Sequence, residues 1–541
     1  MWQSNILTQG ASSADAADTT VEESPLLLHG SLASDSGEAG SPGHSVGESV
    51  TWACLGGAVI MCISPLQYGY HIAELNTPKG IITGCDQHAP VQWRSLPLCL
   101  PMSDAMYSLA TSVFAVGGLV GSLVAGWMSE RWGRRGALIY NNVPFIIGPL
   151  LMALAVSPAM LAAGRFISGV GAGAAVVITP LYLSEIAPVK YRGTLNLLNQ
   201  LSIVLGILAA MTVGMLANRG PYWRVSVGVG LILACLHLLL AGFAPESPRY
   251  LWRCGREAEA RTILRKLRGV ADVDSETAAW STRGRGPRLV STQRLEEEQA
   301  ACSDGSSAVS VEEDGSKPVA ADIAEELRED GASVTIFNIF RIARYRRPWL
   351  LVLLLHFGQQ LSGINTVFFF SSSVLEKMFS SELSSILTML IGVLNVLGTA
   401  FAALIVDRFG RRPLLLSSIG GMVVSVTLLG VSLGLSLNIL AAVSLYLVVM
   451  FFAPGFGPVP FLLGTELFDG RAAGAGGSWG LAANWTGTFI VATLFLSLLN
   501  MVGEWVFAVF VVSLLAVGVV FYLYIPETKG RTIEEISESF K

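Results

Sequence analysis

Charged residues are scarce in this chain of 541 residues: they make up 14% of it, whereas hydrophobic residues make up 52%. Soluble globular proteins carry about 25% charged residues, so the composition argues against a soluble domain. The sequence also lacks the Gly-x-x-x-x-Gly-Lys motif of a phosphate-binding loop, which argues against ATP as an energy source. The net charge of −5 is spread over tails and loops and indicates no nucleic-acid partner.

Reactive and metal-binding patterns are equally sparse. The seven cysteines are scattered, and no His, Cys or carboxylate spacing typical of a metal site occurs. Cys85 and Cys99 share the one sizeable loop expected outside the cytosol, so a disulfide between them is an open alternative to free thiols. No nucleophile–base pair is visible either. We therefore expect no enzyme activity and no cofactor.

Apolar runs of about 20 residues dominate the chain, and each is long enough to cross a hydrocarbon core of about 30 Å. The pattern predicts an all-α membrane protein with twelve transmembrane helices. The first six are expected near 52–74, 105–129, 137–157, 160–183, 194–217 and 222–243, and the second six near 349–373, 384–406, 414–435, 439–464, 475–499 and 504–525.

The charged motifs between these runs occur twice. Arg-Trp-Gly-Arg-Arg at 131–135 recurs as Arg-Phe-Gly-Arg-Arg at 408–412, in each case after the second apolar run of a half. Pro-Glu-Ser-Pro-Arg at 245–249 is echoed by Pro-Glu-Thr-Lys-Gly at 526–530, after the sixth run. Two six-helix halves related by duplication, with a substrate site between them, are typical of secondary transporters. The repetition predicts a carrier.

The organisation follows from these motifs. We expect an N-tail at 1–50, six-helix halves at 51–244 and 348–526, a linker at 245–347 and a short C-tail at 527–541. The polar N-tail shows neither the basic nor the apolar region of a removable signal peptide, so none is expected, and the tail is expected to be disordered. Three Arg in each repeated loop place those loops, the linker and both tails in the cytosol. The linker should have helical ends and a flexible Gly/Ser/acidic middle, roughly 275–330.

The chain resembles the sugar porters of the major facilitator superfamily and is close in motif to the facilitative glucose transporters. The resemblance covers about 52–270 and 335–541. It rests on Gly126-x-x-x-Glu130-Arg131, Gly164-Arg165-Phe166, Gln-Gln-Leu-Ser-Gly-Ile-Asn at 359–365, Gly457-Pro458-Val459-Pro460 and the two Pro-Glu pairs. It implies the major facilitator fold, with alternating access of a central site to the two sides.

A charged set at the cytosolic helix ends is expected to act as a gate. Its members are Arg134, Arg135, Glu185, Arg192 and Glu246 in the first half and Arg411, Arg412, Glu466 and Glu527 in the second. Ion pairs among them could tie helix ends together and close the inner side, and would break when the halves rock. The alternative is that the Arg residues only set topology, which does not require Glu185 and Glu466 at corresponding positions.

Substrate binding is expected from polar residues inside the spans, which are costly there and tend to mark the pathway. The resemblance implies Gln200 on helix 5, Gln359, Gln360 and Asn365 on helix 7, and Asn395 on helix 8. Gln359 and Asn365 are about 120° apart on a helix, but a broad face can hold them together with Gln360. The alternative is that these amides bond helix to helix.

Aromatic rings are expected to pack on the sugar ring. Phe368, Phe369 and Phe370 cover more than one side of helix 7, so one of them is expected to face lipid. Phe368 and Phe461, which occupies a Trp position of close relatives, are expected to line the cavity. Ala453 and Thr488 replace an acidic residue and an Asn of glucose carriers. A hexose-like monosaccharide is therefore expected as the substrate, and glucose is favoured among the hexoses but is not specifically predicted.

His71 and Arg165 bear on the mode of transport. His71 stands where proton-coupled relatives carry Asp and where uniporters often carry Asn. A protonated His beside Arg165 would be disfavoured by like charge, so a neutral His and facilitative uniport are expected. The alternatives are a proton–sugar symporter and a sugar sensor without appreciable flux.

An acidic dileucine pattern lies in the N-tail. Glu22 precedes Leu26 and Leu27 at the spacing of sorting signals that cytosolic adaptors recognise, although short patterns also occur by chance. It predicts a vacuolar or lysosomal membrane, with the plasma membrane as the alternative.

Overall fold

The computed structural model describes residues 50–85, 92–93, 96–284, 334–469, 471–531, 535–536 and 540. The chain divides into a segment of residues 1–45 and one compact unit of residues 46–541, and only the second is described below. Glu22, Leu26 and Leu27 therefore lie outside the described residues, with nearly all of the expected N-tail.

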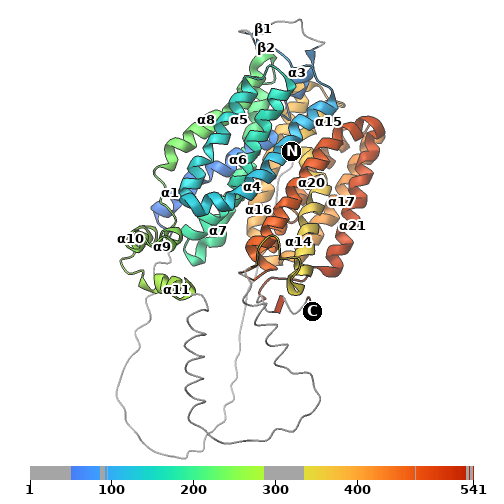
Figure 1. The fold of residues 1–541 in the computed structure, drawn as a ribbon. Helices are drawn as coiled ribbons and strands as arrows, with labels where there is room; N and C mark the ends of the chain where they lie inside the picture. The colour runs from blue at the N-terminus through green and yellow to red at the C-terminus, as the bar shows by residue number, and fades with distance from the viewer. Residues whose placement is uncertain are drawn as a thin grey trace, which may run out of the picture. The chain divides into compact units, whose positions relative to one another are not determined.

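The first half runs from blue to green in Figure 1. Its helices are α1 (Trp52–Met61), α2 (Ile63–Ala73), α3 (Lys79–Thr83), α4 (Asp104–Tyr140), α5 (Asn142–Ala153), α6 (Pro158–Ile186), α7 (Arg192–Leu216) and α8 (Trp223–Ala241), with 3-10 turns at Val189–Tyr191 and Gly220–Tyr222. Serine caps set two of the starts. Ser103 accepts the N–H of Met106 at α4, and Ser157 accepts that of Met160 at α6.

The second half runs from yellow to red (Figure 1). Its helices are α14 (Ala343–Leu361), α15 (Ile364–Leu375), α16 (Ser381–Phe409), α17 (Arg411–Gly434), α18 (Asn438–Phe452), α19 (Val459–Glu466), α20 (Ala473–Val502) and α21 (Val506–Tyr524), with a 3-10 turn at Gly503–Trp505.

The expected transmembrane helices are present. In the described residues, 9 helical stretches are long and apolar enough to cross a membrane. Two of these, Asp104–Ala153 and Ala473–Tyr524, each contain two expected spans, and the tenth expected helix is represented by the shorter Asn438–Phe452. The all-α architecture is therefore confirmed, with a small β-ribbon in one loop.

Two helices of the second half are interrupted where the sequence predicted continuous spans. Helix 7 is divided into α14 and α15 at Ser362 and Gly363, and Gly363 adopts a φ of 80°, in the left-handed region that favours glycine. Helix 10 ends at Phe452 and resumes at Val459, after a Gly- and Pro-rich break. Irregular backbone at membrane depth is tolerated only inside protein or along a cavity, so these breaks indicate a functional region.

Close helix packing organises the first half. Gly117 and Gly121 of α4 face α6, and ideal Cβ atoms on them would lie 2.0 Å from the carbonyl oxygens of Phe166 and Val170. Gly169 and Gly173 of α6 lie equally close to α4. Small residues four apart allow such contact between membrane helices. A side chain at any of these positions would separate α4 from α6.

Among the described residues after the first half, three further helices are present: α9 (Pro248–Arg253), α10 (Glu257–Arg268) and α11 (Asp274–Gly284). The expectation of a flexible chain from about residue 275 is wrong for 275–284, because α11 occupies them. Arg268 binds Glu276 with 2.9 Å between Nη2 and Oε1, and donates to the carbonyl oxygens of Ile186 and Ala187 at the end of α6. These bonds attach the linker helices to the first half.

Bonds among the described residues between α3 and α4 lie on the side that is expected to face away from the cytosol. Cys85 and Cys99 form a disulfide, and β1 (Gln92–Trp93) pairs antiparallel with β2 (Leu96–Pro97). The guanidinium of Arg224 at the start of α8 donates to the carbonyl oxygen of Pro97 at 2.7 Å. The open question of the Cys85–Cys99 pair is thus answered in favour of a bond.

Candidate functional site

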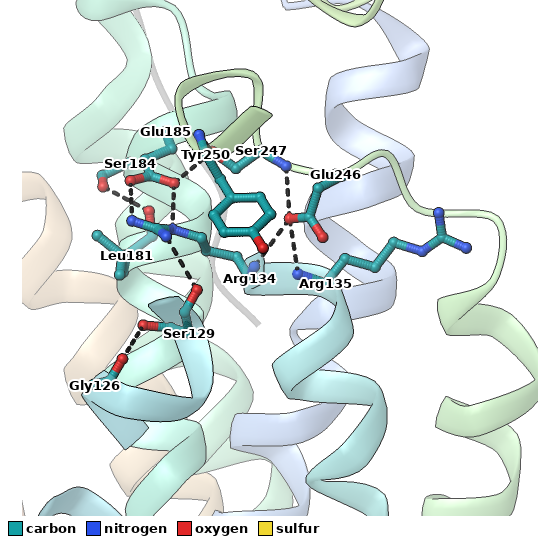
Figure 2. Close-up of polar contacts among 10 residues, drawn as sticks. All are labelled: Gly126, Ser129, Arg134, Arg135, Leu181, Ser184, Glu185, Glu246, Ser247 and Tyr250. Carbon is teal, nitrogen blue, oxygen red and sulfur yellow. Dashed lines mark hydrogen bonds and ion pairs between the residues drawn. The ribbon is translucent and has the colours of Figure 1, made fainter. Parts of the chain in front are cut away.

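A carboxylate holds a turn at the end of the first half that the loop charges predict to face the cytosol. Gly133 interrupts α4 with a φ of 77° and turns the chain between two spans. Oε1 of Glu246 accepts the backbone N–H groups of Arg134 at 2.9 Å, Arg135 at 3.1 Å and Ser247 at 2.8 Å (Figure 2). An ideal Cβ on Gly133 would lie 2.5 Å from Oε2 of Glu246, so a larger residue would displace the carboxylate.

The Arg134 guanidinium completes this arrangement. Its Nη2 donates to Oε1 of Glu185 at 2.8 Å and its Nε lies 2.7 Å from Oε2, with the side chains only 4% and 8% exposed. Ser247 donates from its hydroxyl to the same Glu185 carboxylate (Figure 2). We call Arg134, Arg135, Glu185, Glu246 and Ser247 the first bracket. It joins α4, α6 and the segment before α9.

The second half repeats these contacts in a second bracket, formed by Arg411, Arg412, Glu466, Glu527 and Thr528. Glu527 accepts the N–H groups of Arg411 at 3.0 Å and Arg412 at 3.1 Å. Nε of Arg411 donates to Oε1 of Glu466 at 3.2 Å, and the hydroxyl of Thr528 donates to Oε2 at 2.6 Å. This bracket is more exposed to solvent than the first, because the side chains of Arg411 and Glu466 are 16% and 27% exposed.

Backbone donors hold Glu527 in its charged form. Burial acts to raise the pKa of its carboxyl, but the N–H groups of Lys529, Arg411, Arg412 and Thr528 outweigh burial and hold the pKa below its ordinary value. The carboxylate therefore remains an anion that gathers the start of α17 and the chain after α21.

Each ion pair of the brackets joins two helices that belong to the same half. Arg134 and Glu185 both belong to the first half, and Arg411 and Glu466 both belong to the second. Arg192 departs from the expected set in this conformation, since its electrostatic neighbours are Arg249, Glu276 and Arg268 rather than Glu185. The brackets thus stiffen each half internally, which is the property that a rigid rocking body needs.

Three expected sugar ligands meet at the break in helix 7. Oε1 of Gln360 accepts from Nδ2 of Asn365 at 2.6 Å, and Nε2 of Gln360 lies 3.4 Å from Oε1 of Gln359. Two residues of α20 join them. Asn484 donates to Oε1 of Gln359 at 2.7 Å, and Asn365 donates to Oγ1 of Thr488 at 3.0 Å. We call these five residues the amide cluster.

Gln359 and Gln360 differ in how fully they are bonded. Nε2 of Gln359 donates to the carbonyl oxygens of Phe456 at 2.5 Å and Gly457 at 3.0 Å, in the break of helix 10. Its carbonyl accepts from Asn484 and Gln360, so its hydrogen-bonding capacity is in use. Gln360 makes only one long donor contact and retains capacity for a ligand. The side-chain carbonyl oxygen of Asn365 likewise remains available to accept a hydrogen bond from a ligand.

The other expected ligands lie outside the amide cluster. Gln200 on α7 is half-buried and Asn395 on α16 is buried, and neither has a hydrogen bond to the cluster. Phe368 is buried, whereas Phe461 is 42% exposed and meets His356 edge-on, with ring centroids 4.9 Å apart. The expectation that one of Phe368, Phe369 and Phe370 faces lipid is wrong, because all three pack inside the protein.

An aromatic cluster that the sequence analysis missed joins the two halves near this site. Trp485, next to Asn484 on α20, meets Tyr68 of α2 and Phe114 of α4, with ring centroids 5.8 Å and 6.1 Å apart. Its indole N–H donates to Oγ of Ser122 at 2.9 Å. Its ring lies against Gly118, where an ideal Cβ would be 2.7 Å from ring atoms. The Asn-Trp pair within an apolar run was the available signal.

Arg165 faces a carboxylate that the sequence analysis also missed. Oε1 of Glu74 lies 2.9 Å from Nη1 of Arg165, and Oε2 lies 2.9 Å from Nδ1 of His71. All three side chains are fully buried. The ring of Phe145 stacks on His71, and Cζ of Arg165 lies 4.4 Å from the centroid of Phe114. Glu74 follows His71 by three residues and therefore shares its helix face.

Hydrogen bonds hold the outer ends of the two halves together. Nδ2 of Asn76, after α2, donates to the carbonyl of Phe368 and to Oγ of Ser371, both at 2.8 Å. Its Oδ1 accepts the N–H of Ser372 at 3.0 Å. Between the ends of α7 and α16, Asn218 donates to Ser385 at 3.1 Å. The two halves are therefore bonded to each other at this end, which the loop charges predict to be the outer side.

Comparison with known proteins decides the family. Residues 57–287 and 287–540 match the family described as Sugar (and other) transporter. The chain belongs to this family, within the major facilitator superfamily. It is 32% identical over 498 residues to facilitated glucose transporter member 1 of solute carrier family 2 from Gallus gallus, which covers 90% of this chain and 92% of that protein. It is 33% identical over 486 residues to a probable metabolite transport protein of Saccharomyces cerevisiae, which covers 88% and 93%.

Solved structures share the fold of this sugar transporter. The inward-open xylose transporter XylE from E. coli matches with a TM-score of 0.66 and 22% identity, over 89% of this chain and 98% of that one. A D-xylose-proton symporter matches with a TM-score of 0.64 and 20% identity, over 88% and 99%.

Membership in the family makes the chain an integral multi-pass membrane protein and not an enzyme. Large apolar side chains lie exposed on the helices, including Leu239, Leu404 and Val512, at 73%, 71% and 65%. Such surfaces suit lipid contact. Among the described residues, no group of three or more His, Cys, Asp or Glu could hold a metal ion.

Proposed function

We propose that this protein carries a hexose-like monosaccharide across a membrane by alternating access, as a facilitative uniporter. The amide cluster is the observation that carries the proposal. Sugar hydroxyls need several neutral donors and acceptors held in place, and Gln360 and Asn365 combine fixed positions with unused capacity. The glucose carriers among the relatives support a hexose.

Ala453 and Thr488, the two departures from glucose carriers, reduce the number of acceptors that the site offers to sugar hydroxyls. Ala453 is buried at the start of the break in helix 10 and offers no acceptor for a sugar hydroxyl. Thr488 is already engaged, since its hydroxyl accepts from Asn365 and donates to the carbonyl of Asn484 at 3.0 Å. Fewer acceptors should weaken discrimination between hexoses that differ at one hydroxyl.

The aromatic cluster supplies an apolar wall. Trp485 comes from the second half, and Tyr68 and Phe114 come from the first. Because both halves contribute rings to this wall, the contacts between the rings change when the halves rock. We propose that Phe368 and Phe461 extend it, and that Gln200 and Asn395 approach the sugar from helices 5 and 8.

We propose that the two brackets are the inner gate. Each bracket keeps the cytosolic helix ends of its half in register, so that the half moves as one body. In the outward-open state those ends meet, and Arg192 gains access to carboxylates of the second half.

A proton–sugar symporter is the second candidate, because Glu74 supplies the titratable carboxylate that His71 lacks. Glu74 bonds both His71 and Arg165, so protonation of Glu74 would release Arg165. That would couple proton binding to the contact between α2 and α6. No feature of the described residues favours the sensor alternative.

An uptake panel in proteoliposomes tests the proposal. Hexoses, pentoses and polyols are offered with and without an imposed pH gradient, with protein-free liposomes as the control. Saturable hexose uptake that equilibrates without accumulating is expected. Accumulation that a protonophore abolishes would favour the symporter, and no saturable uptake of any sugar would refute transport.

We propose a vacuolar or lysosomal location from the acidic dileucine pattern at 22–27, through a sorting adaptor. A tagged Leu26→Ala/Leu27→Ala variant should move to the plasma membrane when imaged beside the parent. A parent already at the plasma membrane, or a variant that does not move, would refute this.

A further inference from the structure

A cavity of about 290 Å³ lies where the outer ends of the two halves meet. The first half contributes Lys79, Thr83 and Asp104 to its wall, and the second contributes Ser373, Glu376 and Lys377. Its walls therefore come together only when the outer side is closed. The cavity contains charged groups that the proposed sugar path does not use.

Each half brings one cation and one carboxylate to this cavity. Nζ of Lys79 lies 2.7 Å from Oδ1 of Asp104 within the first half. The charge of Lys79 also acts on Glu376, and that of Lys377 acts on Asp104, in both cases across the two halves. Oδ2 of Asp104 accepts from Nδ2 of Asn500 on α20 at 2.8 Å, which adds a direct bond across the boundary.

Glu376 is a partly buried carboxyl that closure shields from water in part. It caps the end of α15, and Oγ of Ser372 lies 3.3 Å from its Oε1. On the other side it faces α3, where an ideal Cβ on Gly80 would lie 3.8 Å from Oε2. The ring of Tyr107 on α4 lies below Lys79, 5.9 Å from Nζ, and Glu382 at the start of α16 is exposed.

Burial raises the pKa of the Glu376 carboxyl, and the Ser372 hydroxyl and the charge of Lys79 offset this only in part. When the halves separate on the outer side, the carboxyl becomes more exposed to water and its pKa returns toward the ordinary value. The closed state therefore binds the proton more tightly than the open state does. This favours closure at low pH, and the effect is lost as pH rises through the pKa of the closed state.

We propose that Lys79, Asp104, Glu376 and Lys377 form an outer latch, and that acid on the outer side strengthens it by protonating Glu376. Acid in the outer compartment thus holds the carrier outward-closed. The inference rests on the proposed alternating-access cycle and adds control of that cycle by the outer compartment. It does not depend on which sugar is carried or on Glu74.

Distance measurement between spin labels tests the latch in the full-length protein. Leu216 and Met501 lie at the outer ends of α7 and α20, and are 72% and 80% exposed. Cysteines at both positions carry the labels, with Cys235, Cys254 and Cys302 replaced by Ser. Between about pH 7.5 and about pH 5, the fraction of separated outer ends should fall.

Glu376→Gln should lose this pH dependence and stay closed at both pH values, because the amide is neutral throughout. Glu382→Gln is the matched control and should respond like the parent. Lys79→Met should raise the separated fraction at neutral pH. A pH response that survives in Glu376→Gln would overturn the proposal. Sugar uptake in the same preparations is scored separately, so a protein that shows the pH response but no uptake would refute the transport function alone.

Discussion

Oε1 of Glu74 lies 2.9 Å from Nη1 of Arg165, and neither side chain has any exposed surface. A buried ion pair gains stability from its geometry and from the hydrogen bonds around it, and removal of one partner leaves an uncompensated charge. His71 and the carbonyl of Thr111 supply such bonds. The pair joins the end of α2 to α6, which are parts of the first and fourth membrane spans.

Glu74→Gln should be strongly destabilising, because Arg165 would remain buried beside a neutral amide. The expected loss is about 3–5 kcal/mol, the range for breaking a buried pair. Thermal unfolding in detergent, followed by tryptophan fluorescence, measures it. His71→Asn serves as the control and should cost about 1 kcal/mol, since it removes one hydrogen bond to Glu74 and leaves the pair with Arg165 in place.

The double variant Glu74→Gln/Arg165→Gln separates the charge from the packing. It removes both charges and should recover part of the stability that Glu74→Gln loses. A double variant that is no more stable than Glu74→Gln would mean that the ion pair contributes little and that Arg165 acts through packing alone.

The brackets could be predicted from sequence, because charged residues at helix ends are few and recur in both halves. Their pairing could not. Whether Arg134 meets Glu185 or a carboxylate of the second half depends on helix packing, which periodicity does not contain. Glu246 appeared as a further gate residue, but its role as an acceptor of backbone N–H groups required the turn at Gly133.

The breaks in helices 7 and 10 were missed for a different reason. Apolar residues continue on both sides of Gly363 and Pro458, so hydropathy predicts unbroken spans there. Glu74 was overlooked because it stands at the predicted end of helix 1, where a charge is ordinarily solvated. Its burial comes from tertiary packing, in which Phe145 covers its partner His71 and Phe114 covers its partner Arg165.

Gln360→Ala should impair substrate binding without unfolding the protein. Gln360 keeps unused donor capacity in the amide cluster, so its truncation removes a sugar contact worth on the order of 1 kcal/mol, or more if a buried partner is stranded. We expect at least about a fivefold loss in uptake efficiency, measured as initial rates over a range of sugar concentrations. Unchanged half-saturation would place the sugar elsewhere.

The matched control, Gln359→Ala, should instead lower stability, because Gln359 bonds the break in helix 10 through Phe456 and Gly457. Loss of partners for buried carbonyls costs about 1–3 kcal/mol. Thermal unfolding of the two Ala variants side by side distinguishes the roles. Equal melting temperatures would contradict the division into one structural and one binding glutamine.

Glu185→Gln should be more destabilising than Glu466→Gln. Arg134 is nearly buried, whereas Arg411 and Glu466 are partly exposed, and water compensates an exposed charge. Cysteines placed along the inner surface should label faster from the cytosolic side in both variants. If the brackets only set topology, neither labelling nor stability should change.

Cys85→Ser should loosen the outer loop. The Cys85–Cys99 bond closes a loop with a sequence separation of 14, and bonds that close loops of this length stabilise by roughly 3 kcal/mol. Polyethylene-glycol maleimide on the denatured parent protein should shift the band by two more labels after reduction than before. An equal shift in both samples would show that these thiols are free.

Glu527→Gln should reveal a stability contribution that depends on pH. Because the folded state holds the pKa of Glu527 below its ordinary value of 4.5, the charged form stabilises the fold above that value. The contribution is lost as pH falls through the folded-state pKa. Melting temperatures of parent and variant should therefore differ by a few degrees at neutral pH and converge in acid. Glu504→Gln, at an exposed carboxyl in the turn before α21, should show no such convergence. A gap between parent and variant that persists unchanged in acid would mean that the substituted amide disrupts packing and that the carboxylate charge does not hold the second bracket together.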